Sequence, residues 1–274
     1  MRILITGKNG YIAKSLMKHL HTFKFLSDIP GEKEIITVGK EDFDLTNRES
    51  TNEWFKDEFE FTGLKFDVVI HTAIVGGNRL KEDNGEVFYQ NLSMFYNLLA
   101  NQDKFNQLIS FGSGAELGYP ADPYGLSKNI INRIIQSEPK FNNIRIFGVF
   151  DENELDRRFI TPNIKRYINK EPITIHQNKF MDFFYMEDLI TVVNHIIKNP
   201  NVKEITCSYL QPYTLFDIAS LINNLGSHKC EIKIENDGMG DPYISKPQKL
   251  DLPLIGLEKA IKQIYIKLNK SIKN

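Results

Sequence analysis

RILITGKNGYIAKSLMKHL, residues 2–20, joins an apolar β-branched run to a glycine turn and then to a helical pattern. In such a turn Gly7 allows the tight strand-to-helix connection, Gly10 lets backbone amides approach a pyrophosphate, and Ala13 lets the helix pack on the sheet. The same spacing also occurs in turns that bind nothing, but the position between a strand and an amphipathic helix favours cofactor binding. The residues predicted to hold a dinucleotide here are Gly7, Asn9, Gly10, Tyr11 and Ile12.

The same alternation of strand and helix continues along the chain. Helical spacing of apolar residues appears over 11–20 and 87–99, between runs that are apolar on both faces. Those strand-like runs are residues 2–6, 34–38, 66–73, 107–113 and 143–150. Such an alternation predicts an α/β fold with a Rossmann-like, doubly wound parallel sheet.

The alternation of predicted strands and helices becomes less regular after residue 150. Residues 151–171 carry clusters of Asp, Glu and Arg, and residues 236–253 carry three Pro and two Gly. We therefore predict an NAD(P)-binding domain over 1–150, with returning elements at about 172–200, and a smaller, irregular α/β substrate-binding region over 151–274.

Composition narrows the classes of function. Lys and Arg total 34 against 35 Asp and Glu, which gives a net charge of -1 and no field that would attract nucleic acid. No window approaches the roughly 18 apolar residues of a membrane span, and the chain opens on a strand-like run, so we expect a cytoplasmic protein. Cys207, Cys230 and the six His show no metal-ligand spacing, which predicts no metal site.

The end of the second predicted strand bears on the choice of cofactor. An acidic residue there suits the free 2'-hydroxyl of NAD, whereas a cation suits the 2'-phosphate of NADP. Lys40 favours NADP, although it also fits a solvated turn lysine, and Glu41 beside it weakens the signal. Asp44 and Leu45 follow and are expected to face the adenine.

The segment DPYGLSKNIINRII places Tyr124 and Lys128 four residues apart on a predicted helix, so both share one face. An ammonium near a phenol favours the phenolate and lowers the pKa of a tyrosine, which can then exchange a proton with a carbonyl or an alcohol. Ser113 ends the fourth predicted strand, where open parallel sheets bind ligands. Alone, each of these patterns is common by chance; together they indicate oxidoreductase chemistry.

The order of these motifs resembles the extended short-chain dehydrogenases/reductases of the NAD-dependent epimerase/dehydratase family that act on nucleotide sugars. The matching segments are TGKNGYIA, HTA (71–73), SFGSGAELG, YGLSK, RIFGVF (145–150) and FMDFFYMEDL (180–189). The resemblance implies that Tyr124 is the acid/base, that Lys128 holds the nicotinamide ribose and tunes Tyr124, and that Ser113 hydrogen-bonds the reacting oxygen. It also implies cofactor contacts by Thr72 and Ala73.

Departures from the family's motifs restrict the reaction. Dehydratases of the family carry Thr-Asp-Glu where this chain has Ser113-Gly114-Ala115, so dehydration is disfavoured. VGG (75–77) and FYQN (88–91) are similar to GDP-fucose synthases, which also use a Cys at the position of Ala115 for double epimerisation. What remains is reduction of a nucleotide-activated 4-keto-(6-deoxy) sugar, which we prefer, or C4 epimerisation with retained NAD. A non-catalytic NADP-binding sensor or scaffold is the alternative from another class.

Partners follow from the same reasoning. A nucleotide-diphosphate sugar needs cations, and the candidate contacts are Arg157, Arg158, Asn163 and Lys246, although solvated charges explain them equally well. Helices 85–100 and 124–137 carry more apolar residues than one core-facing stripe needs, which predicts a homodimer through these helices. Family members commonly pair in this isologous way.

Overall fold

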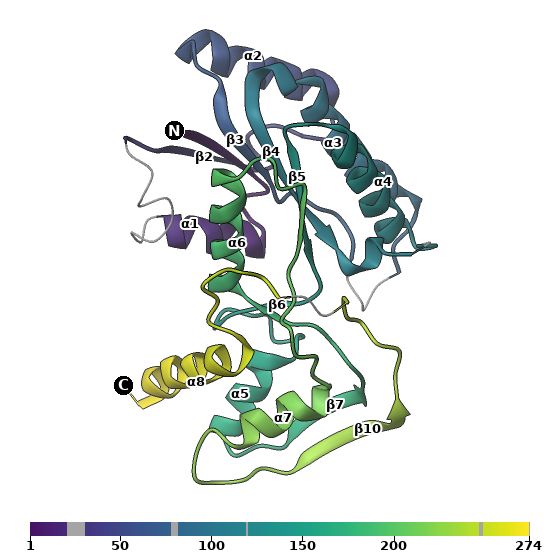
Figure 1. The fold of residues 1–274 in the computed structure, drawn as a ribbon, viewed down its shortest axis with the longest axis vertical. Helices are drawn as coiled ribbons and strands as arrows, with labels where there is room; N and C mark the ends of the chain where they lie inside the picture. Colours follow the sequence, from purple (N-terminus) through teal and green to yellow (C-terminus); the bar gives the residue numbers. More distant parts are fainter. Residues whose placement is uncertain (21–30, 78–81, 119, 247–248, 274) are drawn as a thin grey trace. The chain divides into compact units, whose positions relative to one another are not determined.

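A computed structural model describes residues 1–20, 31–77, 82–118, 120–246 and 249–273 of the chain. The chain divides into two compact units (Figure 1). Unit 1 comprises Met1–Arg145 and Val192–Ile205, and unit 2 comprises Ile146–Thr191 and Thr206–Asn274.

The centre of unit 1 is a six-stranded sheet within the described residues, in the order β2-β1-β3-β4-β5-β9. The strands are β1 (Arg2–Thr6), β2 (Glu34–Val38), β3 (Phe66–His71), β4 (Phe105–Ser113), β5 (Phe141–Ile146) and β9 (Glu204–Thr206). β1 runs parallel to β2 and β3, with Thr6 opposite both Val38 and His71. The loops that follow these three strands therefore leave the sheet side by side, at one edge.

Helices cover both faces of this sheet. Figure 1 shows α3 and α4 together on one face and α1 on the other. The helices of unit 1 are α1 (Tyr11–Leu20), α2 (Arg48–Thr62), α3 (Gly85–Ala100) and α4 (Pro123–Ser137). Side-chain caps fix three of their starts, since Asn47, Asn84 and Asp122 each accept from backbone N–H groups of the first turn. Phe55, Phe95 and Ile135 then pack in one core with Leu4 and Leu108 of the sheet.

Unit 2 is built on two short parallel pairs of strands. One pair is β6 (Val149–Phe150) with β8 (Phe184–Tyr185), and the other is β7 (Ile173–Asn178) with β10 (Ile232–Met239). The other α-helices among the described residues are α5 (Ile160–Ile168), α6 (Met186–Lys198), α7 (Leu215–Asn223) and α8 (Leu257–Lys273). The chain passes between the units at the end of β5, within α6 and at the end of β9.

The predicted fold class, an α/β fold with a parallel central sheet, is confirmed. The boundaries differ in two places. The strand expected over 66–73 ends at His71, so that Thr72 and Ala73 belong to the following loop. The run expected as one strand over 143–150 is two strands, β5 and β6, separated by Phe147 and Gly148.

Candidate active site

The glycine turn closes tightly between β1 and α1. Gly7 has a φ of 76°, and a Cβ at this position would lie 2.7 Å from the backbone N of Ala73. Gly10 N donates to Gly7 O at 2.8 Å, and Lys14 N donates to Gly10 O at 3.0 Å at the start of α1. Glycine is therefore required at Gly7 both for its conformation and for the approach of β3's following loop.

These residues fit a dinucleotide. Asn9 and Gly10 are exposed, Tyr11 and Ile12 are partly exposed, and the first turn of α1 carries no acidic side chain. The helix N-terminus therefore offers its amides and its partial positive charge without a carboxylate from its own first turn.

A charged cluster joins the glycine turn to the loop after β2. Lys8 Nζ lies 2.7 Å from Asp42 Oδ2 and 3.2 Å from Glu41 Oε1, while Asn9 Nδ2 donates to Glu41 Oε1 at 3.0 Å. The hydrogen bond from Lys8 lowers the pKa of Asp42. Lys8 was not among the predicted cofactor contacts, although a lysine inside a glycine turn is visible in the sequence.

Lys40, the predicted cation for a 2'-phosphate, projects into solvent. Its side chain is 84% exposed, and its Nζ lies 3.5 Å from Asp44 Oδ2. Asp44 Oδ1 also accepts from the backbone N and the hydroxyl of Thr46. Leu45 is buried in the core against α3, and Asn97 Nδ2 donates to its carbonyl, so its side chain is not at the surface.

Thr72 and Ala73 hold the loop after β3 against β1. Thr72 Oγ1 donates to Thr6 O at 2.6 Å, and Thr6 Oγ1 lies 2.8 Å from His71 Nδ1. His71 is buried, and burial lowers its pKa to about 3. It is therefore neutral at ordinary pH and serves the structure of this edge.

The proposed catalytic side chains lie on β4 and α4. Ser113 ends β4 and is buried, Tyr124 is partly exposed in the first turn of α4, and Lys128 follows one turn later. Lys128 Nζ donates to Phe111 O at 2.5 Å, which brings the lysine to the carboxyl end of β4, two residues before Ser113. Burial lowers the pKa of Lys128 to about 8. Lys128 therefore loses its proton at a pH only slightly above neutral, whereas an ordinary lysine does so near 10.5.

The loop after β3 also reaches α4. A Cβ at Gly77 would lie 2.8 Å from Cζ of Tyr124, so the loop backbone packs on the tyrosine ring. Asn91 of α3 anchors this loop by accepting from Val75 N at 2.9 Å and donating to Val75 O at 3.0 Å. Neither Gly77 nor Asn91 was predicted as a site residue, because their roles depend on contacts between distant segments.

The predicted substrate contacts belong to unit 2. Arg157, Arg158 and Lys246 are exposed. Asn163 is buried and fully used: its amide nitrogen donates to Phe159 O and Thr174 O, and its Oδ1 accepts from Thr174 N. It ties α5 to β7, and its buried amide is not available to a substrate.

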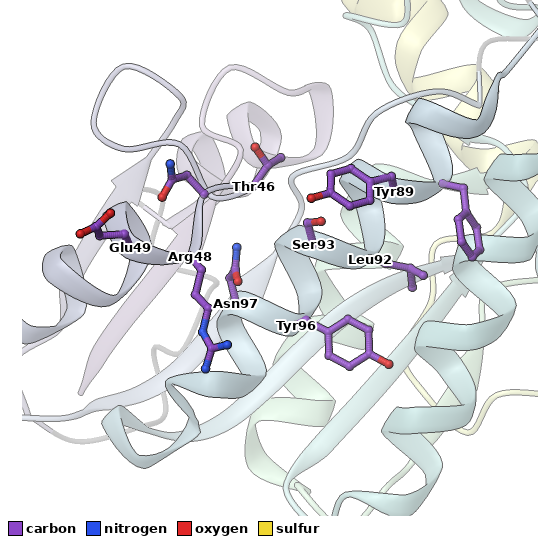
Figure 2. A pocket seen from close by; sticks show the side chains of 10 residues that line it. Thr46, Arg48, Glu49, Tyr89, Leu92, Ser93, Tyr96 and Asn97 are labelled. Atoms are coloured by element: carbon purple, nitrogen blue, oxygen red, sulfur yellow. The ribbon is translucent and has the colours of Figure 1, made fainter.

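A separate hollow of about 530 Å³ lies beside α3 (Figure 2). Its wall is formed by Thr46, Asn47, Arg48, Glu49, Phe88, Tyr89, Leu92, Ser93, Tyr96 and Asn97. Figure 2 shows Tyr89, Leu92 and Tyr96 projecting from α3. None of the predicted catalytic residues lines this hollow.

Among the described residues, no group of three His, Cys, Asp or Glu side chains is placed to hold a metal ion. No helix in the described part of the chain is both long and apolar enough to cross a membrane.

Comparison with known proteins gives the family. The model of the NAD dependent epimerase/dehydratase family matches residues 3–207. CDP-abequose synthase of Yersinia pseudotuberculosis is 22% identical over 262 residues, which cover 88% of this chain and 87% of that protein. Protein CapI of Staphylococcus aureus is 25% identical over 240 residues, which cover 73% of this chain and 70% of that protein.

A solved structure shares the fold along nearly the whole chain. MlghC, the GDP-mannoheptose C4 reductase from Campylobacter jejuni, solved with NADP bound, superposes with a TM-score of 0.76 at 15% identity and covers 97% of this chain and 98% of that one. The family match spans the glycine turn, the sheet and the Tyr124 and Lys128 helix. This chain belongs to the NAD dependent epimerase/dehydratase family.

Proposed function

We propose that this protein is an NADP-dependent reductase of a nucleotide-activated 4-keto-(6-deoxy) sugar in carbohydrate biosynthesis. The observation that carries the proposal is the placement of Lys128. Its Nζ donates to Phe111 O at the end of β4, and Tyr124 lies one helical turn before Lys128 on α4. MlghC is a C4 reductase of a GDP-linked sugar, and its fold is shared along almost the whole chain.

In this mechanism the bound cofactor supplies a hydride to the carbonyl carbon. Tyr124 Oη donates its proton to the carbonyl oxygen, and the charged Lys128 stabilises the phenolate that remains. Ser113 Oγ accepts from Ala115 N at 3.2 Å, which fixes the side chain at the end of β4, where it hydrogen-bonds the same oxygen. With Gly114 and Ala115 after the serine, the chain lacks the acid that dehydration needs at that point.

The choice of NADP rests on two lysines near the end of β2. Lys40 is exposed, and the ammonium of Lys8 lies within the glycine turn, where a 2'-phosphate would compete with Asp42 for it. In unit 2, Arg157, Arg158 and Lys246 are the cations that we propose for the diphosphate of the substrate.

A nucleotide-sugar 4-epimerase with retained NAD is the second candidate. The observation that favours it is the pair of carboxylates, Glu41 and Asp42, beside the glycine turn. Carboxylates there suit the hydroxyls of an unphosphorylated ribose.

We also propose a homodimer through α3 and α4. Of the apolar residues on these helices, Phe95, Leu98, Ile131 and Ile135 belong to the core of unit 1 and are not available to a partner. The side chains left at the surface include Tyr89, which is 63% exposed, Tyr96, Leu126 and the partly exposed Phe88, Leu92 and Ile130. A surface of aromatic side chains on α3 and aliphatic side chains on α4 favours an isologous interface.

The proposal is tested by mixing the protein with NADPH and a panel of 4-keto-6-deoxy nucleotide sugars and following the absorbance of NADPH. We expect oxidation of NADPH with at least one of these sugars. Tyr124→Phe should bind NADPH normally yet lose about 100- to 10,000-fold in turnover, since only the proton donor is removed. Tyr89→Phe, on the outer side of α3, is the matched control and should keep its rate. If the protein binds NADPH but no sugar of the panel causes its oxidation, a sensor or scaffold is favoured.

A further inference from the structure

Glu116 is a buried carboxylate that the mechanism above does not use. It ends the short helical turn η2 (Gly114–Glu116) directly after β4 and is 2% exposed. Its Oε1 accepts from Arg145 Nε at 2.7 Å and from Asn143 Nδ2 at 2.9 Å, and its Oε2 accepts from Ser113 N at 3.0 Å. The carboxylate thus joins the end of β4 to β5.

The surroundings fit an ionised carboxylate. The three groups that contact its oxygens are all N–H donors, and a protonated acid would instead need an acceptor for its own hydrogen. The space is also made for it, since a Cβ at Gly112 would lie 2.5 Å from Glu116 Oε2. Burial raises the pKa of Glu116, and the charge of Arg145 together with these three hydrogen bonds counteracts that rise by stabilising the ionised form.

Glu116 is also held against the helix that carries the proposed catalytic pair. Asn129 Nδ2, next to Lys128 on α4, donates to Glu116 O at 2.7 Å. The negative charge of Glu116 raises the pKa of Lys128 and partly offsets the burial that lowers it. Without this charge, the ammonium of Lys128 would have less to stabilise it.

The other titratable groups near Glu116 and Lys128 do not supply a buried negative charge to Lys128. Arg145, on β5, pairs with Glu116 and, on its other side, with Glu204 of β9, its Nη2 lying 2.6 Å from Glu204 Oε2. His71, on β3, is electrostatically coupled to Lys128, but its pKa of about 3 keeps it neutral. On α4 itself, Tyr124 precedes Lys128 by one turn. Glu116 is thus the buried carboxylate of this group that acts on Lys128.

We propose that Glu116 is a positioning residue of the active site: its carboxylate fixes the backbone of Ser113 and supplies the negative charge that keeps Lys128 an ammonium. The S-x-x-E pattern of residues 113–116, a capping box, is the sequence signal of the first role. The inference deepens the proposed reduction, because both residues that Glu116 acts on are assigned to that reaction.

The charge role is tested without any substrate. In protein labelled with ¹³C at lysine Cε, the Lys128 resonance is identified as the one missing from Lys128→Met, and its chemical shift is followed against pH. We expect a midpoint near 8 in the wild type and about one pH unit lower in Glu116→Gln. Glu204→Gln is the matched control, since it removes a carboxylate from the same Arg145 but not the one acting on Lys128, and its midpoint should stay that of the wild type.

Glu116→Asp separates charge from position and serves if the Gln variant does not fold. It keeps the charge but shortens the reach to Ser113 N, so the Lys128 midpoint should remain near that of the wild type. An Asp midpoint that falls by a full unit, or a Gln midpoint equal to that of the wild type, would overturn the charge role.

Turnover adds a second readout if the proposed reaction holds. The fall of kcat/KM at high pH should move to lower pH in Glu116→Gln by the same amount as the Lys128 midpoint, and Glu204→Gln should not move it. Absence of turnover in the wild type would contradict the proposed function alone, because the titration of Lys128 needs no substrate. A shifted midpoint with an unshifted profile would show that the charge of Lys128 does not serve the reaction and would overturn the positioning role.

Discussion

Gly77 and Tyr124 are in direct contact, since a Cβ added at Gly77 would lie between 2.8 and 3.1 Å from three atoms of the tyrosine ring. Gly77 also has a φ of 69° and donates its N–H to Asp83 Oδ2 at 2.8 Å. The loop after β3 thus packs against the ring of the proposed acid/base, and at Gly77 there is no room for a side chain.

Gly77→Ala should therefore lower turnover by about 10- to 100-fold with little change in NADPH affinity, because a misplaced reacting group costs rate rather than cofactor binding. The matched control is Gly63→Ala, which has a φ of 66° and nothing within 4 Å of the added Cβ. It carries the same backbone strain of about 1 kcal/mol without the ring contact and should leave turnover unchanged. Equal losses in the two variants would show that strain, not the Tyr124 contact, is responsible.

Lys128→Met should raise the free energy of unfolding at pH 7. The pKa of Lys128 is about 8 in the folded chain against an ordinary value of 10.5, so its charge costs the folded state roughly 3 kcal/mol at pH 7. The lost hydrogen bond to Phe111 O subtracts about 1 kcal/mol, which leaves a net gain of about 2 kcal/mol.

The sign of the pH dependence provides the check. Between about pH 8 and 10.5 the folded chain binds fewer protons than the unfolded chain, so wild-type stability rises with pH and the advantage of Lys128→Met shrinks. Urea unfolding at pH 7 and pH 10 measures this. A variant that is less stable at pH 7 by an amount independent of pH would contradict the buried ammonium.

Two lysines should set the cofactor preference. We expect NADPH to bind about 5- to 30-fold more tightly than NADH, since an exposed contact of a lysine with a 2'-phosphate contributes on the order of 1–2 kcal/mol. Lys40→Ala and Lys8→Ala should each reduce this ratio, and added salt should reduce it further. Lys56→Ala, on α2, is the control. A wild type that prefers NADH would point to Glu41 and Asp42 as ribose ligands and so to the epimerase.

The homodimer is tested by one charged substitution. Tyr96, which is 47% exposed, lies on α3 in the proposed interface. Tyr96→Glu would bury an unpaired carboxylate between the subunits and so weaken the dimer. Light scattering should give twice the chain mass of 31.7 kDa for the wild type and a value near 31.7 kDa for the variant. Phe61→Glu, at a side chain 90% exposed on α2, should remain a dimer. A wild-type mass near 31.7 kDa at micromolar concentration would refute the proposal.

The sequence was sufficient for the parallel sheet, because its signals are local. The glycine turn and the strand of residues 2–6 lie next to each other in the chain, and the structure has β1 end at Thr6 as expected. The family was also visible in the order of short motifs, each a few residues long. The break between β5 and β6 was not visible, because Phe147 and Gly148 continue the apolar run on which the prediction depended.

Site residues defined by distant contacts were not predictable in the same way. The S-x-x-E pattern of residues 113–116 indicates only a cap, and nothing local in the sequence indicates the contact of Glu116 with Arg145, which is 29 residues away. Conversely, Asn163 looked like a substrate contact, but its amide is spent on the backbone of α5 and β7. Leu45 likewise turned out to belong to the core.

The central claim, hydride transfer to C4 of a sugar with Tyr124 as the proton donor, is tested most directly with NADPH in which deuterium replaces both hydrogens at C4 of the nicotinamide. The substrate is the 4-keto nucleotide sugar that gives the fastest NADPH oxidation, and the product is analysed by mass and NMR. We expect one deuterium per product, located at sugar C4, one NADP formed per sugar reduced, and almost no product in Tyr124→Phe. A C4 epimer formed from a 4-hydroxy sugar without deuterium and without net NADPH oxidation would contradict the reductase.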